Sequence, residues 1–467
     1  MVSIDPTQVT QSDKPDTSNR FYFAAWRWHF YAGLYVIPFF IMLATTGMVM
    51  LWLAFLVGRD GENYVVVPSD ETVAVSQMAT AAVQAVPGGE LKQYVAPRAP
   101  DLAALFRVDV DGDATMVAVS PYTGEVLAEY PRRTGLYDLM DNIHGSLLLG
   151  VTGDRMIETA ASLGMVLIAS GLYMWWPRGD HNWRKALIPT FSRGRSLWKS
   201  LHGVVGFWVS IVLAFFLVSG LAWSGIWGEK LTQAWSQFPA EKWGAPLSDT
   251  THASLNNGPK EVPWALELTP MPSSGSVAGS AGVAVGIPLT VDTMDRLARE
   301  IGFAGRYQMN LPNGETGVWT LSQDSMSNDN PNPTSDRTVH VDRYTGNILA
   351  DVRYADYSVA GKAMAVGISL HMGTMGIWSV LANTLVCLSV LFLSISSIVL
   401  WWKRRPNGAR RIAAPPLPRD LPLWKGAVVV CLFVAMAFPM AGLTLLAVLA
   451  IDHLIISRVP GLKSALS

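Results

Sequence analysis

Four of the eight histidines form two matched sets, and their positions indicate metal-binding chemistry. His29 and His202 each stand near the start of a long apolar segment, and a glycine follows each of them four residues later. His144 and His371 correspond in the same way further along the chain. An ionisable side chain at membrane depth is costly and usually faces a bundle interior or a cofactor. The repetition predicts paired ligands: a first pair, His29 with His202, and a second pair, His144 with His371.

Haem iron is the metal that this pattern favours. Neutral imidazole is a strong axial ligand, and membrane cytochromes hold b-type haem between helices. We therefore expect two haem b groups, one for each pair, with glycines that let a flat macrocycle approach the backbone (Gly33, Gly145, Gly206 and Gly373). Zinc is the rival metal, but no Cys, Asp or Glu lies at a useful spacing from these histidines. The absence of Cys-x-x-Cys-His excludes c-type attachment.

Arginines near the histidines are candidates for the haem propionates. Arg27 lies two residues before His29, and Arg155 lies between His144 and the apolar core of the next segment. Arg155 could equally be an interfacial arginine whose head group reaches water. Arg178 and Arg404, at the ends of two apolar segments, are similar candidates. Of the other histidines, His340 shares a strand face with polar residues, which suits a surface position or substrate contact.

The composition is that of a polytopic membrane protein. The chain has 467 residues, of which 50% are hydrophobic, 15% are charged and 18 are Trp. A net charge of −1 gives no case for nucleic-acid binding. Cys387 and Cys431 both lie in apolar runs, so no disulfide framework or Cys-rich metal site is expected. Nucleotide-binding and hydrolase motifs are also missing.

Five segments are apolar enough to span a bilayer, for which about 20 residues are needed. The two short loops between them are basic, whereas the two long regions are mixed or acidic. The positive-inside rule then places the N-terminus and both short loops in the cytoplasm, and both long regions on the outer side of the membrane. Arg458 and Lys463 weakly oppose this orientation. The five segments are Phe30–Val57, Met156–Trp176, Val204–Trp227, Ile377–Trp402 and Lys425–Ile451.

Both long regions carry the same predicted hairpin. Alternating apolar and polar residues flank Tyr122-Thr-Gly124 in one region and Tyr344-Thr-Gly346 in the other. A helix-like stretch precedes each, near Val73–Val86 and Leu289–Ile301. Each region is therefore expected to form a small α+β module.

The two halves repeat one another, which predicts an internal duplication followed by an extra fifth span. The expected organisation is a disordered tail (1–20), first span (21–57), first module (58–143), pre-membrane helix and second span (144–177), basic loop (178–198), third span (199–227), second module (228–361), pre-membrane helix and fourth span (362–402), basic loop (403–424), fifth span (425–456) and tail (457–467).

These motifs resemble those of the PepSY-associated transmembrane family, often labelled iron-regulated membrane proteins. The similarity rests on the paired Tyr-Thr-Gly hairpins, the His-x-x-x-Gly segments and the Trp-Trp-Pro-Arg178 and Trp-Trp-Lys-Arg404 ends of two spans. Some members are siderophore-iron reductases of the bacterial inner membrane, such as the ferrioxamine reductase FoxB. The resemblance implies haem b held by membrane histidines, PepSY-like periplasmic modules and outward electron transfer. The flavin/NAD reductase domain of larger relatives has no counterpart in this sequence.

The function expected from these observations is reduction of a ferric siderophore. Electrons from a cytoplasmic reductase or quinol would cross the bilayer and convert Fe(III) to Fe(II), which hard oxygen chelators hold more weakly. Electron transfer needs no proton-abstracting catalytic residue. Two alternatives stay open: a non-enzymatic PepSY protein that regulates or binds a partner, and a haem or iron transporter.

Overall fold

The computed structural model describes residues 17–59, 63–178, 183–233, 238–256, 261–405, 412, 414–415, 432–455 and 458–459. Its chain divides into two compact units whose boundaries fall within four long helices. Unit 1 comprises Met1–Ile41, Met156–Leu217 and Ser389–Ser467. Unit 2 comprises Met42–Arg155 and Val218–Leu388.

Four helices among the described residues are long and apolar enough to cross a membrane. They are α1 (Thr17–Leu56), α4 (Val151–Trp175), α6 (Arg195–Leu221) and α9 (Ile377–Trp402). Helix α1 is continuous through Pro38. The short helix α5 (Trp183–Ala186) precedes α6. These helices confirm the first four predicted spans, although α1 starts inside the predicted tail.

The fifth predicted span is described only in part. Residues 416–431 lie outside the described residues, residues 432–437 are helical, and α11 (Pro439–Leu454) begins after Phe438. Pro439 is the first residue of α11, where its missing amide proton leaves no helical hydrogen bond unmade. With 16 residues, α11 is shorter than the four spans.

Unit 2 contains one eight-stranded antiparallel sheet. The strand order is β10-β9-β8-β7-β1-β2-β3-β4, so each half contributes a four-stranded meander, and the two meanders join where β1 pairs with β7. We had expected two small modules, and the structure instead merges their strands into one sheet. The strands are β1 (Glu90–Val95), β2 (Ala104–Val110), β3 (Asp113–Val119), β4 (Val126–Pro131), β7 (Gln308–Asn310), β8 (Val318–Gln323), β9 (Arg337–Asp342) and β10 (Ile348–Arg353).

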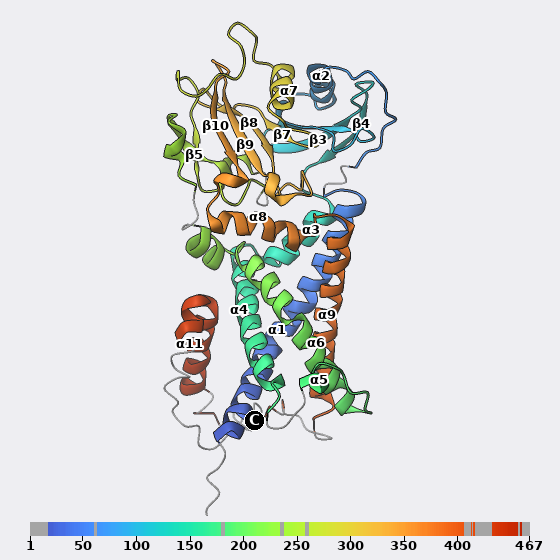
Figure 1. Cartoon of the computed structure of the whole chain (residues 1–467), viewed down its shortest axis with the longest axis vertical. Helices are drawn as coiled ribbons and strands as arrows, with labels where there is room; N and C mark the ends of the chain where they lie inside the picture. Colours follow the sequence, from blue (N-terminus) through green and yellow to red (C-terminus); the bar gives the residue numbers. More distant parts are fainter. Residues whose placement is uncertain are drawn as a thin grey trace, which may run out of the picture. The chain divides into compact units, whose positions relative to one another are not determined.

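One face of the sheet carries a shared apolar core. Helices α2 (Val75–Ala85) and α7 (Val291–Glu300) lie side by side over this face (Figure 1), and the amide of Ser76 donates to Asp292 Oδ1. Strand residues from both halves, such as Phe106 and Leu321, are fully buried in the same core. Alternation along the strands sends their other side chains to the opposite face.

The opposite face is covered by the segment before α7. It contains the two-stranded sheet of β5 (Leu247–Thr251) and β6 (Pro270–Pro272), and the short helical turns η1 (Gly225–Thr232), η3 (Ala240–Trp243) and η4 (His252–Leu255). The turns η5 (Pro333–Ser335) and η6 (Tyr354–Asp356) flank β9 and β10, and helices α3 (Leu136–Ser146) and α8 (Val359–Met372) complete the unit. Figure 1 shows α3 and α8 on the side of the sheet away from α2 and α7.

The two predicted hairpins are present and have matching geometry. Gly124 joins β3 to β4 with a φ of 74°, and Gly346 joins β9 to β10 with a φ of 72°. Both angles lie in the left-handed region, which glycine adopts without steric cost. The hydroxyl of Tyr122 donates to Pro100 O, and that of Tyr344 donates to Glu315 O, each at 2.8 Å.

Candidate functional site: two histidine pairs

The first pair faces a large cavity in unit 1. His29 on α1 and His202 on α6 both line a cavity of about 900 Å³. The two imidazoles are close enough to interact electrostatically. Gly33 and Gly206, each four residues after its histidine, line the same cavity.

The second pair lies in unit 2, on the two short helices that precede spans. His144 is near the C-terminal end of α3, and His371 is near the C-terminal end of α8. A proton on His144 would disfavour a proton on His371, so the two rings are near neighbours. Each unit therefore brings together one histidine from each half of the chain.

A hydroxyl group on a neighbouring helix holds every one of the four imidazoles. The contact always involves Nδ1: His29 with Ser170 Oγ at 3.0 Å, His202 with Ser396 Oγ at 2.8 Å, His144 with Thr46 Oγ1 at 2.9 Å, and His371 with Ser219 Oγ at 2.8 Å. In each half, the first span's histidine contacts a serine of the second span, and the short helix's histidine contacts a hydroxyl of the first span. Sequence reasoning missed these four hydroxyl residues.

The hydroxyls fix the tautomer of three of the rings. Thr46 donates its only hydroxyl proton to Met42 O, Ser170 donates to Val166 O, and Ser396 donates to Leu393 O. A hydroxyl that already donates its proton to a carbonyl can only accept a hydrogen bond from the imidazole. Nδ1 of each ring therefore carries the hydrogen. The lone pair of His144, His29 and His202 is therefore on Nε2. A metal-bound histidine commonly has this arrangement, in which the second ring nitrogen donates to a fixed acceptor.

Small residues beside the hydroxyls make room for the rings. A Cβ atom added to Gly47 would lie 3.3 Å from His144 Cε1, and one added to Gly171 would lie 3.3 Å from His29 Cε1. The corresponding distance from Gly220 to His371 is 3.7 Å. The hydroxyl–glycine dipeptide, spaced 17 residues after both His29 and His202, is the sequence signal that could have revealed these contacts.

The residues of the unit 1 cavity suit haem better than a bare metal ion. Its walls are mostly apolar or aromatic, it contains two imidazoles, and none of its lining residues is Asp or Glu. The described residues form no group of three or more His, Cys, Asp or Glu side chains that could hold a metal ion. A porphyrin supplies four nitrogen ligands of its own, so it requires only the two imidazoles from the protein.

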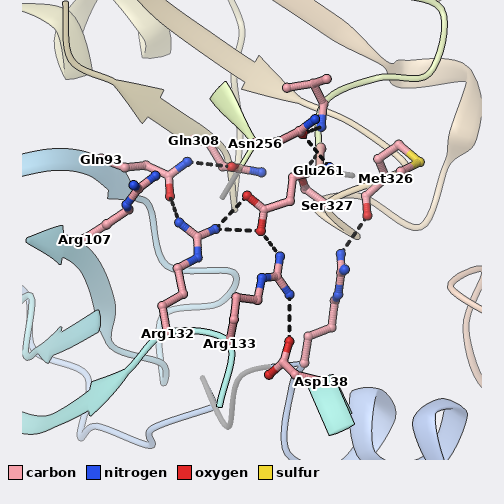
Figure 2. A network of polar contacts seen from close by, with 12 residues as sticks. Gln93, Arg107, Arg132, Arg133, Asp138, Asn256, Glu261, Gln308, Met326 and Ser327 are labelled. Carbon is pink, nitrogen blue, oxygen red and sulfur yellow. Dashed lines mark hydrogen bonds and ion pairs between the residues drawn. The ribbon is translucent and has the colours of Figure 1, made fainter. Parts of the chain in front are cut away.

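A buried ion network attaches α3, and with it His144, to the sheet. Figure 2 shows Arg132 and Arg133, which follow β4, converging on the carboxylate of Glu261. Arg132 Nη2 lies 2.9 Å from Glu261 Oε1, and both side chains are 7% exposed. Arg133 also reaches Asp138 Oδ1 on α3 at 3.3 Å. A pair of charges buried this deeply requires each partner to neutralise the other.

Helix α8, which carries His371, is fixed at both ends. Ser358 Oγ accepts from the amide of Gly361 at the N-terminal end. Gly373 ends the helix with a φ of 71°, as a C-cap glycine commonly does. Asn383 donates to the carbonyls of Leu370 and His371, which lie in the last turn and lack helical partners.

Three of the four sequence-predicted arginines are absent from the lining of the described cavity. Arg27 donates to Pro415 O and stacks on Tyr31, and it is not among the cavity-lining residues. Arg155 pairs with Asp154 at 2.6 Å in unit 2. Arg178 stacks on Tyr173, whereas Arg404 does line the cavity.

The remaining described histidines have other environments. His252 and His340 are completely buried in unit 2, so the predicted surface position of His340 is wrong. Burial lowers the pKa of His252 to about 4 and that of His340 well below its usual value. His453 is exposed near the end of α11, and His181 lies outside the described residues.

Comparison with known proteins identifies a family for most of the chain. The family description "PepSY-associated TM region" matches residues 26–404, which include all four histidines of the two pairs. A search of curated proteins finds no match. Because the matched region covers most of the chain, this membrane protein belongs to the PepSY-associated TM region family.

Proposed function

We propose that the chain is a di-haem b electron-transfer protein of the bacterial inner membrane and reduces a ferric siderophore at its periplasmic side. The observation that carries the proposal is the paired arrangement of imidazoles whose Nδ1 atoms are held by hydroxyls. His29 and His202 would hold one haem, and His144 and His371 the other. Bound haem supplies one-electron chemistry between ferric and ferrous iron.

The protein's own residues orient and shield this chemistry. Ser170 and Ser396 keep the Nε2 lone pairs of the first pair available, and Thr46 does so for His144. Most of the cavity wall around the first pair is apolar, and an apolar surrounding of this kind tunes a redox centre. The second pair sits on α3 and α8, in the same unit as the sheet.

The substrate would be a ferric chelate, and the sheet of unit 2 would form part of its binding surface. Each Fe(III) takes one electron from the reduced protein and leaves as Fe(II), which hard oxygen ligands bind more weakly. A cytoplasmic reductase or a quinol would restore the electron. This assignment to the siderophore-reductase branch also draws on the family resemblance of the motifs.

The absorption spectrum of the purified full chain tests the proposal. We expect a Soret band, α-band features after dithionite reduction and two haems per chain. His202→Ala and His371→Ala should each remove or alter one haem and spare the other, whereas His453→Ala, which changes an exposed histidine, should retain both. A protein that stays colourless after haem is added would refute haem binding.

A second measurement separates electron transfer from haem storage or transport. The protein is reduced, freed of excess reductant and mixed with a ferric siderophore and a ferrous-iron indicator. Reoxidation of the protein with one Fe(II) formed per electron supports reductase activity. A stable reduced spectrum, or iron or haem crossing proteoliposomes without reductant, argues for the other functions.

A further inference from the structure

The short helix α3 of unit 2 turns an apolar face outward. Leu136, Leu139 and Ile143 are three and four residues apart, so they lie on one side of the helix. Leu136 is 55% exposed and Leu139 is 45% exposed, whereas Tyr137 and Asp138 on the other side are buried. A helix on the surface of a soluble protein has the reverse arrangement, with its apolar side toward the core.

Contacts on the buried side hold α3 in this orientation. Asp138 accepts hydrogen bonds from Arg133 Nη1 and from the amide of Gly135, each at 3.3 Å. The guanidinium of Arg59 lies 5.4 Å from the centre of the Tyr137 ring. These contacts fix the rotation of α3 about its axis, so the two leucines of its apolar face remain exposed.

The exposed apolar surface continues through the turn between α3 and α4. Leu148 is 60% exposed, Leu149 is 57% exposed and Val151, the first residue of α4, is 72% exposed. The amide of Leu148 donates to Asn142 O, and the amide of Leu149 donates to Ser146 O. The exposed leucines therefore belong to a hydrogen-bonded turn with a defined conformation.

This turn has an unfavourable backbone conformation. Leu147 and Leu148 have φ values of 53° and 59°, in the left-handed region that residues with a Cβ atom rarely adopt. A Cβ atom at Gly153 would overlap the carbonyl of Ser146, so α3 ends directly against the first turn of α4. Strained conformations persist where the surrounding structure determines them, and they cluster at functional sites.

The start of α4 places this surface at the boundary of the membrane. The 25 residues of α4 extend about 37 Å, and the hydrocarbon core of a bilayer is about 30 Å thick. A helix only slightly longer than the core begins near the headgroups, and the exposed turn directly precedes it. In the other half of the chain, Trp378 is the second residue of α9 and is 54% exposed. Tryptophan is enriched at the level of the headgroups.

We propose that α3 and the turn after it form an interfacial membrane-binding element, covered by lipid of the leaflet that surrounds the start of α4. Its exposed leucines (Leu136, Leu139, Leu148 and Leu149) enter the boundary between headgroups and acyl chains, to a depth of about 5–10 Å. Insertion removes their apolar surface from water, which favours the bound state. The proposal does not depend on haem binding. Because α3 also carries His144, insertion fixes the depth of this imidazole in the membrane.

Site-directed spin labelling of the full chain in phosphatidylethanolamine and phosphatidylglycerol liposomes tests the proposal. The labelled variants are Leu148→Cys and Leu139→Cys, in a protein whose Cys387 and Cys431 are replaced by alanine. Microwave power saturation compares collisions of the label with oxygen, which concentrates among acyl chains, and with a water-soluble nickel chelate.

Val277→Cys is the matched control. Val277 is also apolar and is 96% exposed, but it lies three residues before Ser280, which pairs with Ile348 of the edge strand β10. Collisions with oxygen should exceed those with nickel at both leucine positions, at a depth of about 5–10 Å below the phosphates. The order should reverse at the control position.

Two results would overturn the proposal. A label at either leucine position that collides with nickel as readily as the control label would show that α3 lies in water. Low collision rates with both reagents would show that protein, such as a second copy of the chain, covers this face instead of lipid. Leu149→Cys replaces any labelled variant whose circular dichroism spectrum differs from that of the wild type, so a misfolded variant does not decide the outcome.

Discussion

The Nε2 atoms of His252 and His340 lie 2.9 Å apart, and neither side chain is exposed. His252 Nδ1 donates to the carbonyl of Thr269, so its Nε2 can only accept in the neutral state. His340 Nε2 must then donate, and its Nδ1 accepts from the hydroxyl of Thr320 at 3.0 Å. This chain of hydrogen bonds fixes β9 and β8 to the covering segment, and two charged rings would break it because both Nε2 atoms would then carry a proton.

Acidification should therefore weaken unit 2 through His252. Its pKa is about 4 in the folded protein because burial disfavours the charged ring, against about 6.5 when unfolded. The folded state binds fewer protons than the unfolded state. The stabilisation that comes from neutral His252 is therefore complete above pH 6.5 and is lost progressively as the pH falls toward 4. The free energy of unfolding should fall by up to about 3 kcal/mol when this contribution is lost.

The measurement is the thermal unfolding midpoint in detergent at several pH values, for wild type and His252→Gln. The comparison between wild type and variant is needed because a second group responds to pH in the opposite sense. Burial raises the pKa of Asp336 to about 7, so protonation of this carboxyl stabilises the fold on acidification over the same pH range. The wild type should lose more stability than the variant between pH 7 and 5. Identical slopes would show that the histidine pair does not control the response; His453→Gln serves as the control.

Removal of a hydroxyl that orients an imidazole should weaken haem binding at one site. Thr46→Val keeps the shape of the side chain but deletes the acceptor for His144 Nδ1. Loss of such an outer contact typically costs tenfold to a hundredfold in affinity, and we expect a change of that order. Haem titration with spectra of both sites checks this. Thr45→Val, one residue away, should behave as the wild type; equal effects of the two variants would contradict the assignment.

Enlarging Gly47 should displace the His144 ring. Even a Cβ would come within 3.3 Å of Cε1, so the branched side chain of Gly47→Val forces the imidazole to move. The electron paramagnetic resonance signal of the oxidised protein should change for one haem. Thr45→Val, an exposed position two residues before Gly47, is the control. An unchanged electron paramagnetic resonance signal from Gly47→Val would show that the His144 imidazole does not lie beside Gly47.

Glu261→Gln should destabilise unit 2 substantially. The substitution leaves Arg132 and Arg133 buried without their shared carboxylate, and breaking a buried ion pair costs about 3–5 kcal/mol. The midpoint of thermal unfolding measures the loss. Glu90→Gln breaks the pair with Lys92, in which the glutamate is 72% exposed, and should change stability by less than about 1 kcal/mol. Comparable losses of stability in Glu261→Gln and Glu90→Gln would contradict the prediction that the buried ion pair contributes more than the exposed one.

Local sequence patterns predicted much of the fold. The Tyr-Thr-Gly turns required only the residues around Gly124 and Gly346, and apolar length alone identified the first four spans. The pairing of β1 with β7 was beyond such reasoning, because it joins segments from different halves and depends on side-chain packing across a shared core.

The candidate site was predictable to a similar degree. The repeated motifs grouped the four histidines into two pairs, and the members of each pair lie in the same unit. Their partners could not be read from spacing alone: Ser170 meets His29 only because α1 packs against α4. His340 was misplaced for the same reason, since the alternation in β9 does not reveal that the segment containing His252 covers that strand face.

The junction of β1 and β7 also bears on how the protein is made. Until β7 has been synthesised, β1 is the edge of a four-stranded meander, and its amide and carbonyl groups lack a partner strand. An unpaired edge is a template for aggregation with other chains. Two membrane spans, α4 and α6, must be translated before β7 emerges. The nascent first half therefore exposes an unpaired strand edge until both of those helices have been translated.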